Sequence, residues 1–543
     1  MKKIGILLDD LDVKNCQKKI INFVVGHPLL KLEIVLINNN VSLRNNSRFF
    51  YRLLQAMDRK IFKVANDAFT VEKSAITYPV PIESIKGVET RSSYRFPDEE
   101  IQKIKDLDLD VLIRFGFGIL KGDILTAAKH GIWSLHHGDN DVNRGGPPGF
   151  WEVVIGEDVT GVTLQKLSTD LDAGEVIRKS FIKTNRTSFN RNQNNIFWAG
   201  VELFTSALSD LSLGKLMVTP VERSFEKTTK DITTGFYSYP LYKDPGNQKA
   251  VKIFLSFWHR RIGEIIKEKI SYPNWALYYN FSSNGSVEKA LFRYKKLRPP
   301  KGYDWADPFV VSYNEEYFLF FEELKINGKG HISFLSFDKE GKLKTSKSNV
   351  ALKESYHLSY PFIFQYNSAY YMIPEGAESN EVWIYESMEF PMRWEKRFKI
   401  MDKKALYDPT LIFKENMWYL FATEKIHEGS STEEYFNIYS SEELFSTNWL
   451  PHPENPLTRD DRGSRPAGRI FEQNGKLIRP AQIGAPQYGY GIQFNEIIEL
   501  SPFNYSEKKI DSILPKFRYG IIATHTFNFD GNLAVVDAQG TYE

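Results

Sequence analysis

The sequence has little cysteine and little excess charge. Cys16 is the only cysteine among 543 residues, and the formal net charge is only +2. A single cysteine excludes an internal disulfide and a metal centre built on several cysteines, and it fits a reducing compartment. The small net charge argues against a nucleic-acid-binding protein, whose surface would need a large positive excess.

Long hydrophobic runs are also absent. No stretch approaches the roughly 18 uncharged apolar residues that a membrane-spanning helix needs. The apolar start of the chain, MKKIGILLDD, is soon interrupted by Asp9 and Asp10. It therefore predicts a buried first strand and not a signal peptide. We expect a cytoplasmic protein without a transmembrane segment.

Aromatic residues, in contrast, are abundant at 14% of the chain. Their flat rings suit β-sheet packing and also stacking on sugar rings, and the first use is the commoner one. The length is too great for one compact core and predicts two or three domains.

Residues 1–215 alternate short apolar runs with stretches of helical spacing. This alternation predicts a Rossmann-like α/β domain with a mostly parallel sheet. The expected strands cover 3–9, 31–38 and 110–120, and the expected helices cover 42–62 and 192–213. A connecting region with an amphipathic helix over 251–270 is expected at 216–271.

Residues 272–543 contain a repeat of about 50 residues, each copy with a proline, an apolar strand, an Asn-containing turn and a second strand. The copies begin at Asp307, Tyr360, Asp408 and Arg465. With a fifth copy formed from the two ends of this region, the pattern predicts an all-β five-bladed propeller. A sandwich of hairpins is the alternative, but it would not explain a fixed period.

One segment of the first domain, SLHHGDNDVNRGGPPGFWEV at 134–153, gathers the side chains that carbonyl chemistry requires. Such chemistry needs a proton-transferring group, a partner that orients it, and donors for a developing oxyanion. His136 can transfer the proton, and Asp172 in the later loop LSTDLDAGEVI can orient it. In a parallel sheet, both would lie beyond the carboxyl ends of strands, where ligands bind.

Residues 131–177 resemble the formyltransferases that use 10-formyltetrahydrofolate, a group that includes sugar N-formyltransferases. The resemblance rests on the ordered elements GI, LH, RG, FWEVVIGE, TGVTLQKL and DLDAGEVI. It implies a catalytic trio at Ser134, His136 and Asp172. The family has an asparagine where this chain has Ser134, and the loss of one oxyanion donor costs about 10²- to 10³-fold in rate.

The resemblance also implies the ligands of this domain. 10-Formyltetrahydrofolate would be the co-substrate, and an amino sugar or nucleotide-sugar would accept the formyl group. No metal is predicted. The cofactor would contact Phe117, Gly118, Ile119, Leu120, Thr169 and Asp170, and the acceptor would contact His137, Arg144 and Gly145.

The repeated prolines of the propeller predict a central channel lined by Asp307, Tyr360, Asp408, Arg465 and Glu375. This half resembles the five-bladed glycoside hydrolases of the arabinanase and β-xylosidase group, in which Asp307 would be a general base. Tyr360 stands where that group has an aspartate, and a glycosidase needs two carboxylates beside the scissile bond. A sugar-binding or assembly module is therefore favoured over a hydrolase.

Together these features predict an N-formyltransferase-like enzyme of surface polysaccharide biosynthesis that acts on an amino sugar and carries a carbohydrate-binding propeller. Two alternatives stay open. The first is a carbohydrate-binding or assembly protein whose transferase domain is degenerate. The second is a glycoside hydrolase that uses propeller carboxylates. The sequence leaves the acceptor sugar and the oligomeric state undetermined.

Overall fold

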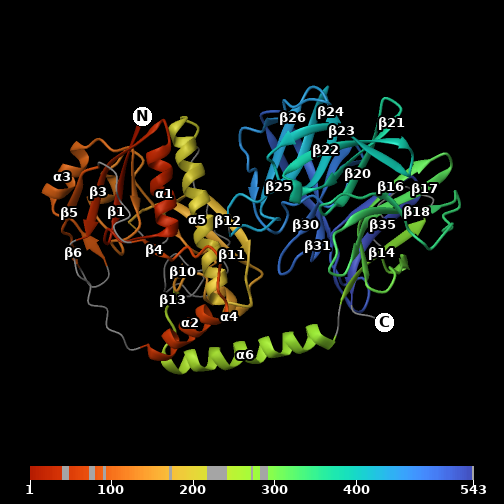
Figure 1. Ribbon diagram of the computed structural model, residues 1–543. Helices are drawn as coiled ribbons and strands as arrows, with labels where there is room; N and C mark the ends of the chain where they lie inside the picture. Colours follow the sequence, from red (N-terminus) through yellow and green to blue (C-terminus); the bar gives the residue numbers. More distant parts are fainter. Residues whose placement is uncertain are drawn as a thin grey trace. The chain divides into compact units, whose positions relative to one another are not determined.

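The chain divides into two compact units in the computed structural model (Figure 1). The first comprises Met1–Arg261 with His427–Ser430, and the second comprises Ile262–Ile426 with Ser431–Glu543. The structure describes residues 1–38, 48–72, 80–89, 93–142, 144–169, 174–216, 241–270, 273–281, 291–427 and 429–540.

The first unit is an α/β domain built on a seven-stranded sheet of order β12-β11-β9-β8-β1-β3-β5. The five strands from β9 to β5 are parallel, whereas β11 is antiparallel to both of its neighbours. The strands are β1 (Lys2–Leu8), β3 (Leu30–Asn38), β5 (Ile82–Ile85), β8 (Val111–Arg114), β9 (Ile132–His136), β11 (Val159–Lys166) and β12 (Glu175–Lys183). The predicted α/β architecture with a mostly parallel sheet is confirmed.

The continuous apolar runs of the central strands exist because both faces of this sheet are covered. Ile4 and Ile6 of β1 pack in a cluster with residues of α1 and α5, whereas Leu7 packs in a second cluster with residues of α3. The helices of this unit are α1 (Asn15–Gly26), α2 (Phe49–Ile61), α3 (Asp98–Asp106), α4 (Trp151–Ile155), α5 (Phe189–Ser212) and the first part of α6 (Asn247–Ile270). Small pairs of strands lie outside the main sheet: β2 (Val13–Lys14) with β4 (Val71–Glu72), β6 (Val88–Glu89) with β7 (Tyr94–Arg95), and β10 (Arg144–Gly145) with β13 (Leu241–Tyr242).

The predicted helices form where helical spacing supplies an apolar face. Ser188 begins α5, because its hydroxyl accepts a hydrogen bond from the Arg191 amide and so satisfies a free donor of the first turn. The early part of the helix expected at 42–62 lies outside the described residues. Among the helices that the structure describes, none is long and apolar enough to cross a membrane.

The second unit is a five-bladed β-propeller, as predicted. Each of the first four blades contains one copy of the sequence repeat. Blade one is β16 (Tyr303–Tyr313), β17 (Glu316–Lys325), β18 (His331–Phe337) and β19 (Asn349–Leu352). Blade two is β20 (Ser359–Tyr366), β21 (Ala369–Glu375), β22 (Glu381–Glu389) and β23 (Arg393–Asp402). Blade three is β24 (Leu406–Lys414), β25 (Met417–Glu424), β26 (Tyr435–Ser441), β27 (Leu450–Pro451) and β28 (Thr458–Arg459), and blade four is β29 (Phe471–Gln473), β30 (Lys476–Ile483), β31 (Gly491–Leu500) and β32 (Tyr505–Ile513).

The fifth blade closes the ring with strands from both ends of the region. β14 pairs with β35 from Asn274 opposite Gly540 to Phe281 opposite Leu533. Its strands are β14 (Asn274–Phe281), β15 (Lys295–Leu297), β33 (Ile521–Ala523), β34 (Phe527–Asp530) and β35 (Leu533–Gly540). This closure joins the two ends of the region in one blade, and the ring of blades leaves only short, protected sheet edges.

The first strands of three blades share an unusual backbone feature. Asp307, Tyr360 and Asp408, each followed by proline, have positive φ angles of 52°, 43° and 49°. Each lies at a register shift within its hairpin. Such a conformation is costly for residues other than glycine and concentrates at functional sites. The repeat therefore turns three polar side chains in the same way from three successive blades.

Candidate functional site

A cavity of about 240 Å³ lies at the carboxyl ends of β8 and β9. It collects several side chains that the sequence placed in the first site, including the imidazole of His136. Its lining residues are Arg114, Ile119, Leu120, Leu135, His136, His137, Gly145, Pro148, Gln165, Leu167, Ser168 and Thr169. Asp170 and Asp172 lie outside the described residues, so the proposed pairing of His136 with Asp172 stays a prediction.

Ser134 is 2% exposed and lies two residues before His136 on β9. Its hydroxyl oxygen accepts a hydrogen bond of 2.8 Å from Nη1 of Arg114. Nη2 of the same guanidinium donates to the carbonyl oxygen of Gly118. Arg114, which the sequence reasoning did not select, therefore connects the predicted oxyanion position with the predicted cofactor loop. Its only signal in the sequence is a charged residue that ends the apolar run VLI.

His137 packs against the helix α5, with its ring stacked on Phe197 at a centroid distance of 3.7 Å. Burial, with smaller contributions from His136 and Lys14, lowers the pKa of His137 to about 3. Its imidazole is consequently neutral at physiological pH. In the described structure, Nε2 of His137 has no hydrogen-bond partner.

The turn after β8 differs in part from its predicted role as a cofactor contact. The Phe117 side chain is completely buried in the hydrophobic cluster that contains residues of α3, and the Phe117 amide donates to Oδ1 of Asp9 at 2.8 Å. The carbonyl of Gly118 already accepts from Arg114. Ile119, Leu120 and Thr169 line the cavity.

On the acceptor side, Gly145 lines the cavity at a φ of 86°, and a Cβ there would collide with the carbonyl oxygen of Tyr242. Glycine is therefore required at this position. Arg144 belongs to the same strand, β10, but its side chain is outside the part of the chain that the structure describes. The nearby Asp139 and Asp141 pair with Lys179, at 2.7 and 2.6 Å.

A second polar cluster lies at the axis of the propeller. Its centre is Arg465, which is 5% exposed. Nε of Arg465 donates to Asp408 Oδ2 at 2.6 Å, and Nη2 donates to Asp408 Oδ1 at 3.0 Å and to Glu375 Oε2 at 2.8 Å. Gln482 also donates to Asp408 Oδ2, at 2.6 Å. Three predicted channel residues thus meet directly.

Tyr360 joins this cluster through its backbone and its hydroxyl group. Its amide donates to Asp307 Oδ2 at 3.3 Å. Its hydroxyl shares a 2.8 Å hydrogen bond with Thr410 and accepts one from the Gly468 amide at 2.8 Å. Tyr360 is fully buried. It therefore braces the inner strands, and its ring is not open to a ligand.

Asp307 belongs to a triad with His525 and Asp537, two residues that the sequence reasoning missed. Nδ1 of His525 lies 2.6 Å from Asp537 Oδ2 and 3.8 Å from Asp307 Oδ1. The two carboxylates overcome the effect of burial and raise the pKa of His525 to about 9. Burial is the main cause that raises the pKa of Asp307 to about 7.

The same three residues offer atoms that lie within 4.8 Å of one another, as a small cation would require. A protonated imidazole has no lone pair for a metal, so the ion-paired triad is the state that the raised pKa of His525 favours. The sequence signal for it is the polar run Thr524, His525 and Thr526, which lies between β33 and β34.

Burial also raises the pKa of Glu375, although Arg465 opposes this effect. Arg465 offsets burial only in part, because its guanidinium is shared by two carboxylates and gives two of its hydrogen bonds to Asp408. The cluster comprises Asp307, Glu375, Asp408, Arg465, His525 and Asp537, which we call the axial site. It holds more carboxylates than cations.

Aromatic rings surround the cations of the axial site. The guanidinium of Arg465 lies 5.5 Å from the ring centre of Tyr407 and 5.6 Å from that of Tyr488. Tyr488 is 40% exposed and meets the His525 ring edge-on at 5.4 Å, and Trp275 stacks on the same imidazole at 4.1 Å. The site is thus polar at its centre and aromatic at its margin.

The two folds define the class of the chain: an α/β unit that resembles the Rossmann-like formyltransferase folds, followed by a five-bladed propeller. A solved sugar N-formyltransferase from Shewanella sp. covers 41% of this chain and 75% of its own, with 13% identity and a TM-score of 0.28. The family 117 glycoside hydrolase Zg3597 of Zobellia galactanivorans covers 50% of this chain and 90% of its own, with 10% identity and a TM-score of 0.33.

More specific similarities come from sequence. A family model described as glucosamine inositolphosphorylceramide transferase 1, N-terminal, matches residues 300–526. Proteins of that name from Oryza sativa subsp. japonica and Arabidopsis thaliana are 32% and 33% identical over 209 and 219 residues, which is 38% and 40% of this chain. The chain spans only 28% of the length of each of these relatives. Methionyl-tRNA formyltransferase of Listeria monocytogenes is 28% identical over 152 residues, 28% of this chain and 46% of its own.

These similarities correct one prediction. Formyl transfer to an amino sugar, predicted as the function, is wrong, because the more similar relatives are named as glucosamine inositolphosphorylceramide transferases and the formyltransferase similarity is weaker and partial. The error arose because the histidine segment was given more weight than the propeller repeat. Both groups of named relatives are transferases by name, so transferase activity stays a proposal for this chain.

Proposed function

We propose that this protein is a transferase that acts on a sugar-bearing substrate, and that the axial site of the propeller recognises an amino sugar within that substrate. The observation that carries the proposal is the convergence of buried carboxylates, one guanidinium and partly exposed aromatic rings at one place. Asp408, Glu375 and Arg465 supply hydrogen-bond groups held in fixed geometry. Tyr407 and Tyr488 supply ring faces.

The charge balance of the axial site favours a cationic sugar. Asp307 and Glu375 have raised pKa values because burial is not fully offset by neighbouring cations. A protonated amine placed beside them would lower both pKa values, since an opposite charge stabilises a carboxylate. An amino sugar carries such an amine together with hydroxyl groups and an apolar ring face. It therefore matches the carboxylates and the tyrosine rings at once.

The names of the relatives support the same ligand class, because the family model that matches residues 300–526 refers to glucosamine and to a ceramide. A sugar linked to a lipid is therefore the substrate class that we propose. The α/β cavity would serve the transfer step, with His136 as its proton-transferring group.

The folate carrier is a narrower proposal for the α/β cavity. Ile119, Leu120 and Thr169 line this cavity, which supports a flat ligand there. The hydrogen bond from Arg114 to the Gly118 carbonyl opposes it, because this carbonyl is part of the predicted cofactor loop. Titration of the full chain with 10-formyltetrahydrofolate tests folate binding separately from sugar binding.

The cytoplasmic location of the protein stays a prediction.

Calorimetric titration of the full chain with glucosamine, N-acetylglucosamine and glucose tests the main proposal. We expect glucosamine to bind at least about tenfold more tightly than glucose, since a charge-assisted hydrogen bond contributes about 1.5–3 kcal/mol. Tyr488→Ala should weaken glucosamine binding, because it removes a ring from the margin of the axial site. Tyr519→Ala is the matched control, as Tyr519 is 97% exposed. Equal or undetectable binding of all three sugars would contradict the proposal.

A further inference from the structure

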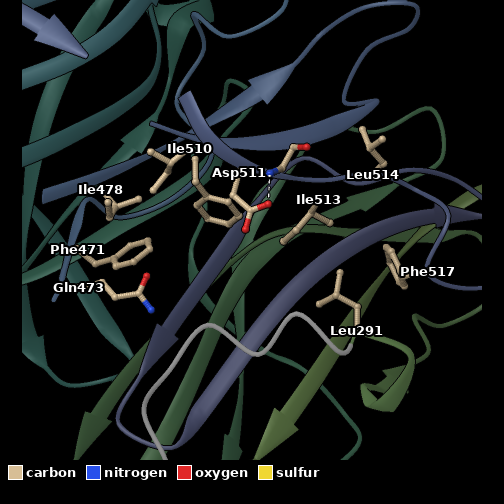
Figure 2. A pocket seen from close by; sticks show the side chains of 11 residues that line it. Leu291, Phe471, Gln473, Ile478, Ile510, Asp511, Ile513, Leu514 and Phe517 are labelled. Carbon is tan, nitrogen blue, oxygen red and sulfur yellow. Dashed lines mark hydrogen bonds between the residues drawn. The ribbon is translucent and has the colours of Figure 1, made fainter. Parts of the chain in front are cut away.

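A second cavity lies in the propeller, away from the axial site. It is lined by strands of blade four, by Leu291 of a short 3-10 helix (Leu291–Arg293) and by the segment that follows β32. Its volume is about 380 Å³, within the range of small-molecule pockets. Its lining residues are Leu291, Phe471, Gln473, Ile478, Phe494, Ile510, Asp511, Ser512, Ile513, Leu514 and Phe517. Figure 2 shows Phe471, Gln473 and Ile478 at one end of this cavity, and Leu291 and Phe517 at the other.

Eight of the eleven lining residues are apolar, although the surface of the cavity is about half polar, and part of the lining is exposed to solvent. Ile510 is 47% exposed and Leu514 is 38% exposed. Phe292, the neighbour of the lining residue Leu291, is 63% exposed. Apolar residues that are exposed next to each other at the mouth of a cavity are typical of a surface that binds an apolar group.

Two basic side chains lie near the end of the cavity that contains Phe517. The Phe517 ring meets Tyr278 edge-on at 6.2 Å, and the side chains of Lys296 and Arg518 lie over that tyrosine at 5.8 and 5.6 Å. Arg518 also donates to the carbonyls of Phe292 and Tyr294, at 3.5 and 3.4 Å. The ring of Tyr278 therefore lies between the cavity residue Phe517 and the two cations, Lys296 and Arg518.

The two segments beside this end are themselves basic. Residues 291–300, LFRYKKLRPP, contain four basic residues and no acidic one. Residues 514–519, LPKFRY, contain two more basic residues. Arg293 and Lys516 are exposed members of these segments. The one carboxylate of the lining, Asp511, accepts a hydrogen bond from the Ser512 amide at 2.9 Å and lies between the two ends (Figure 2).

We propose that this cavity binds a hydrocarbon chain of an anionic, phosphate-bearing lipid, with the phosphate at the basic end. The apolar lining takes the chain, and Arg293, Lys516 and the cations on Tyr278 attract the phosphate. This inference deepens the proposed function, because a sugar substrate linked to a lipid would then be held by both its sugar and its lipid part. It depends on none of the axial residues.

A series of soluble alkyl phosphates tests the two halves of this site. Calorimetry of the full chain with inorganic phosphate, butyl phosphate and octyl phosphate should show affinity that rises with chain length. Each methylene that enters the cavity is expected to strengthen binding by about fourfold until the cavity is filled. Octanol, which lacks the phosphate, should bind more weakly than octyl phosphate. Affinity that does not depend on chain length would overturn the proposal.

Leu514→Glu places a carboxylate at the edge of the cavity and should abolish the dependence on chain length. Phe503→Glu is the matched control, because Phe503 is 73% exposed and does not line the cavity. Circular dichroism tests whether both variants are folded. If Leu514→Glu fails to fold, Leu514→Gln replaces it, with weaker octyl phosphate binding as the expected result.

Vesicle binding tests the basic end. The full chain should sediment with vesicles of equal parts phosphatidylserine and phosphatidylcholine, and less with phosphatidylcholine alone. Arg293→Gln and Lys516→Gln should each weaken binding by about fivefold. Lys353→Gln and Lys403→Gln, which remove exposed charges from other blades, should have little effect. Equal loss in both pairs of variants would contradict a specific site.

The axial variant Tyr488→Ala separates this inference from the proposed function. It should bind octyl phosphate like the unaltered protein while it loses affinity for glucosamine. Failure of glucosamine to bind any form of the protein would remove the proposed sugar recognition alone. Failure of octyl phosphate to bind would remove the lipid site alone.

Discussion

Two histidines, one half-buried in the α/β unit and one buried in the propeller, have pKa values shifted in opposite directions. The pKa of His137 in the α/β unit falls to about 3, and that of His525 in the propeller rises to about 9. Burial lowers both pKa values, because it disfavours the charged imidazole. The difference comes from the neighbours: His137 stacks on Phe197, whereas His525 lies beside Asp537 and Asp307.

The same contrast extends to the two sites as a whole. In the described part of the α/β unit, Nε2 of the cavity residue His137 and Oδ1 of Asn140, which donates to the cavity residue Gln165, are buried without hydrogen-bond partners. Around the propeller axis, Asp408 and Asp537 each accept several hydrogen bonds. A low dielectric strengthens satisfied groups and penalises unsatisfied ones. Several hydrogen bonds therefore fix the axial carboxylates, although Oε1 of Gln482 in the described part of the same cluster is also buried without a partner.

The largest expected effect comes from removal of the central cation of the axial site. Arg465→Met leaves Asp408 and Glu375 without their shared partner in a buried environment. We expect a loss of about 3–5 kcal/mol in the stability of the propeller, measured from its urea unfolding transition. Arg462→Met is the matched control, because Arg462 is 46% exposed and pairs with Asp460 at the surface. A similar small effect of both variants would show that the axial network is not cooperative.

Stability should depend on pH in opposite directions in the two units. The raised pKa of His525 means that its stabilising contribution is complete below pH 6.5 and is lost as the pH rises through about 9. The raised pKa of Asp307 acts in the same direction up to about pH 7. The lowered pKa of His137 means that its contribution is present above pH 6.5 and is lost as the pH falls toward 3.

Amide hydrogen exchange, resolved by peptide at several pH values, measures these two dependences separately. His525→Gln should flatten the alkaline loss of protection in the propeller, and His137→Gln should flatten the acid loss in the α/β unit. Each variant is the control for the other. An unchanged pH dependence in His525→Gln would mean that another group titrates at the axis.

The smallest expected effect concerns Ser134. Ser134→Ala removes the hydroxyl that accepts from Arg114, and it should lower the stability of the α/β unit by about 1 kcal/mol. Thermal melting measures the change. Ser212→Ala, at the end of α5, is the control, because its hydroxyl only donates to the Ser209 carbonyl one turn away. A larger loss of stability for Ser212→Ala would mean that the hydrogen bond between Ser134 and Arg114 contributes little to the stability of the α/β unit.

Sequence reasoning was most successful where the relevant information is local. The repeated proline and Asn-containing turns predicted the blades, since each hairpin is specified by a few neighbouring residues. The turn residues Asn314, Asn367, Asn416 and Asn474 all have positive φ, as tight hairpin turns require. The apolar runs of β1 and β3 likewise predicted a buried parallel sheet.

The prediction was less complete where function depends on distant residues. Arg114 was missed, because nothing near it in the sequence indicates that its guanidinium reaches Ser134. His525 and Asp537 were missed for the same reason, as their partner Asp307 belongs to the first blade. The assignment of formyl transfer failed because a local motif was taken to describe the whole chain.

The amino-acid sequence by itself determined the order of strands and helices, the five-bladed repeat and the residues that begin the inner strands, because these follow from local periodicity and turn chemistry. Only the tertiary structure decided which charges meet. Arg465 finds Asp408 and Glu375, 57 and 90 residues away, through closure of the propeller ring. The pKa of a buried group depends on such neighbours in space, and the linear sequence does not contain their distances.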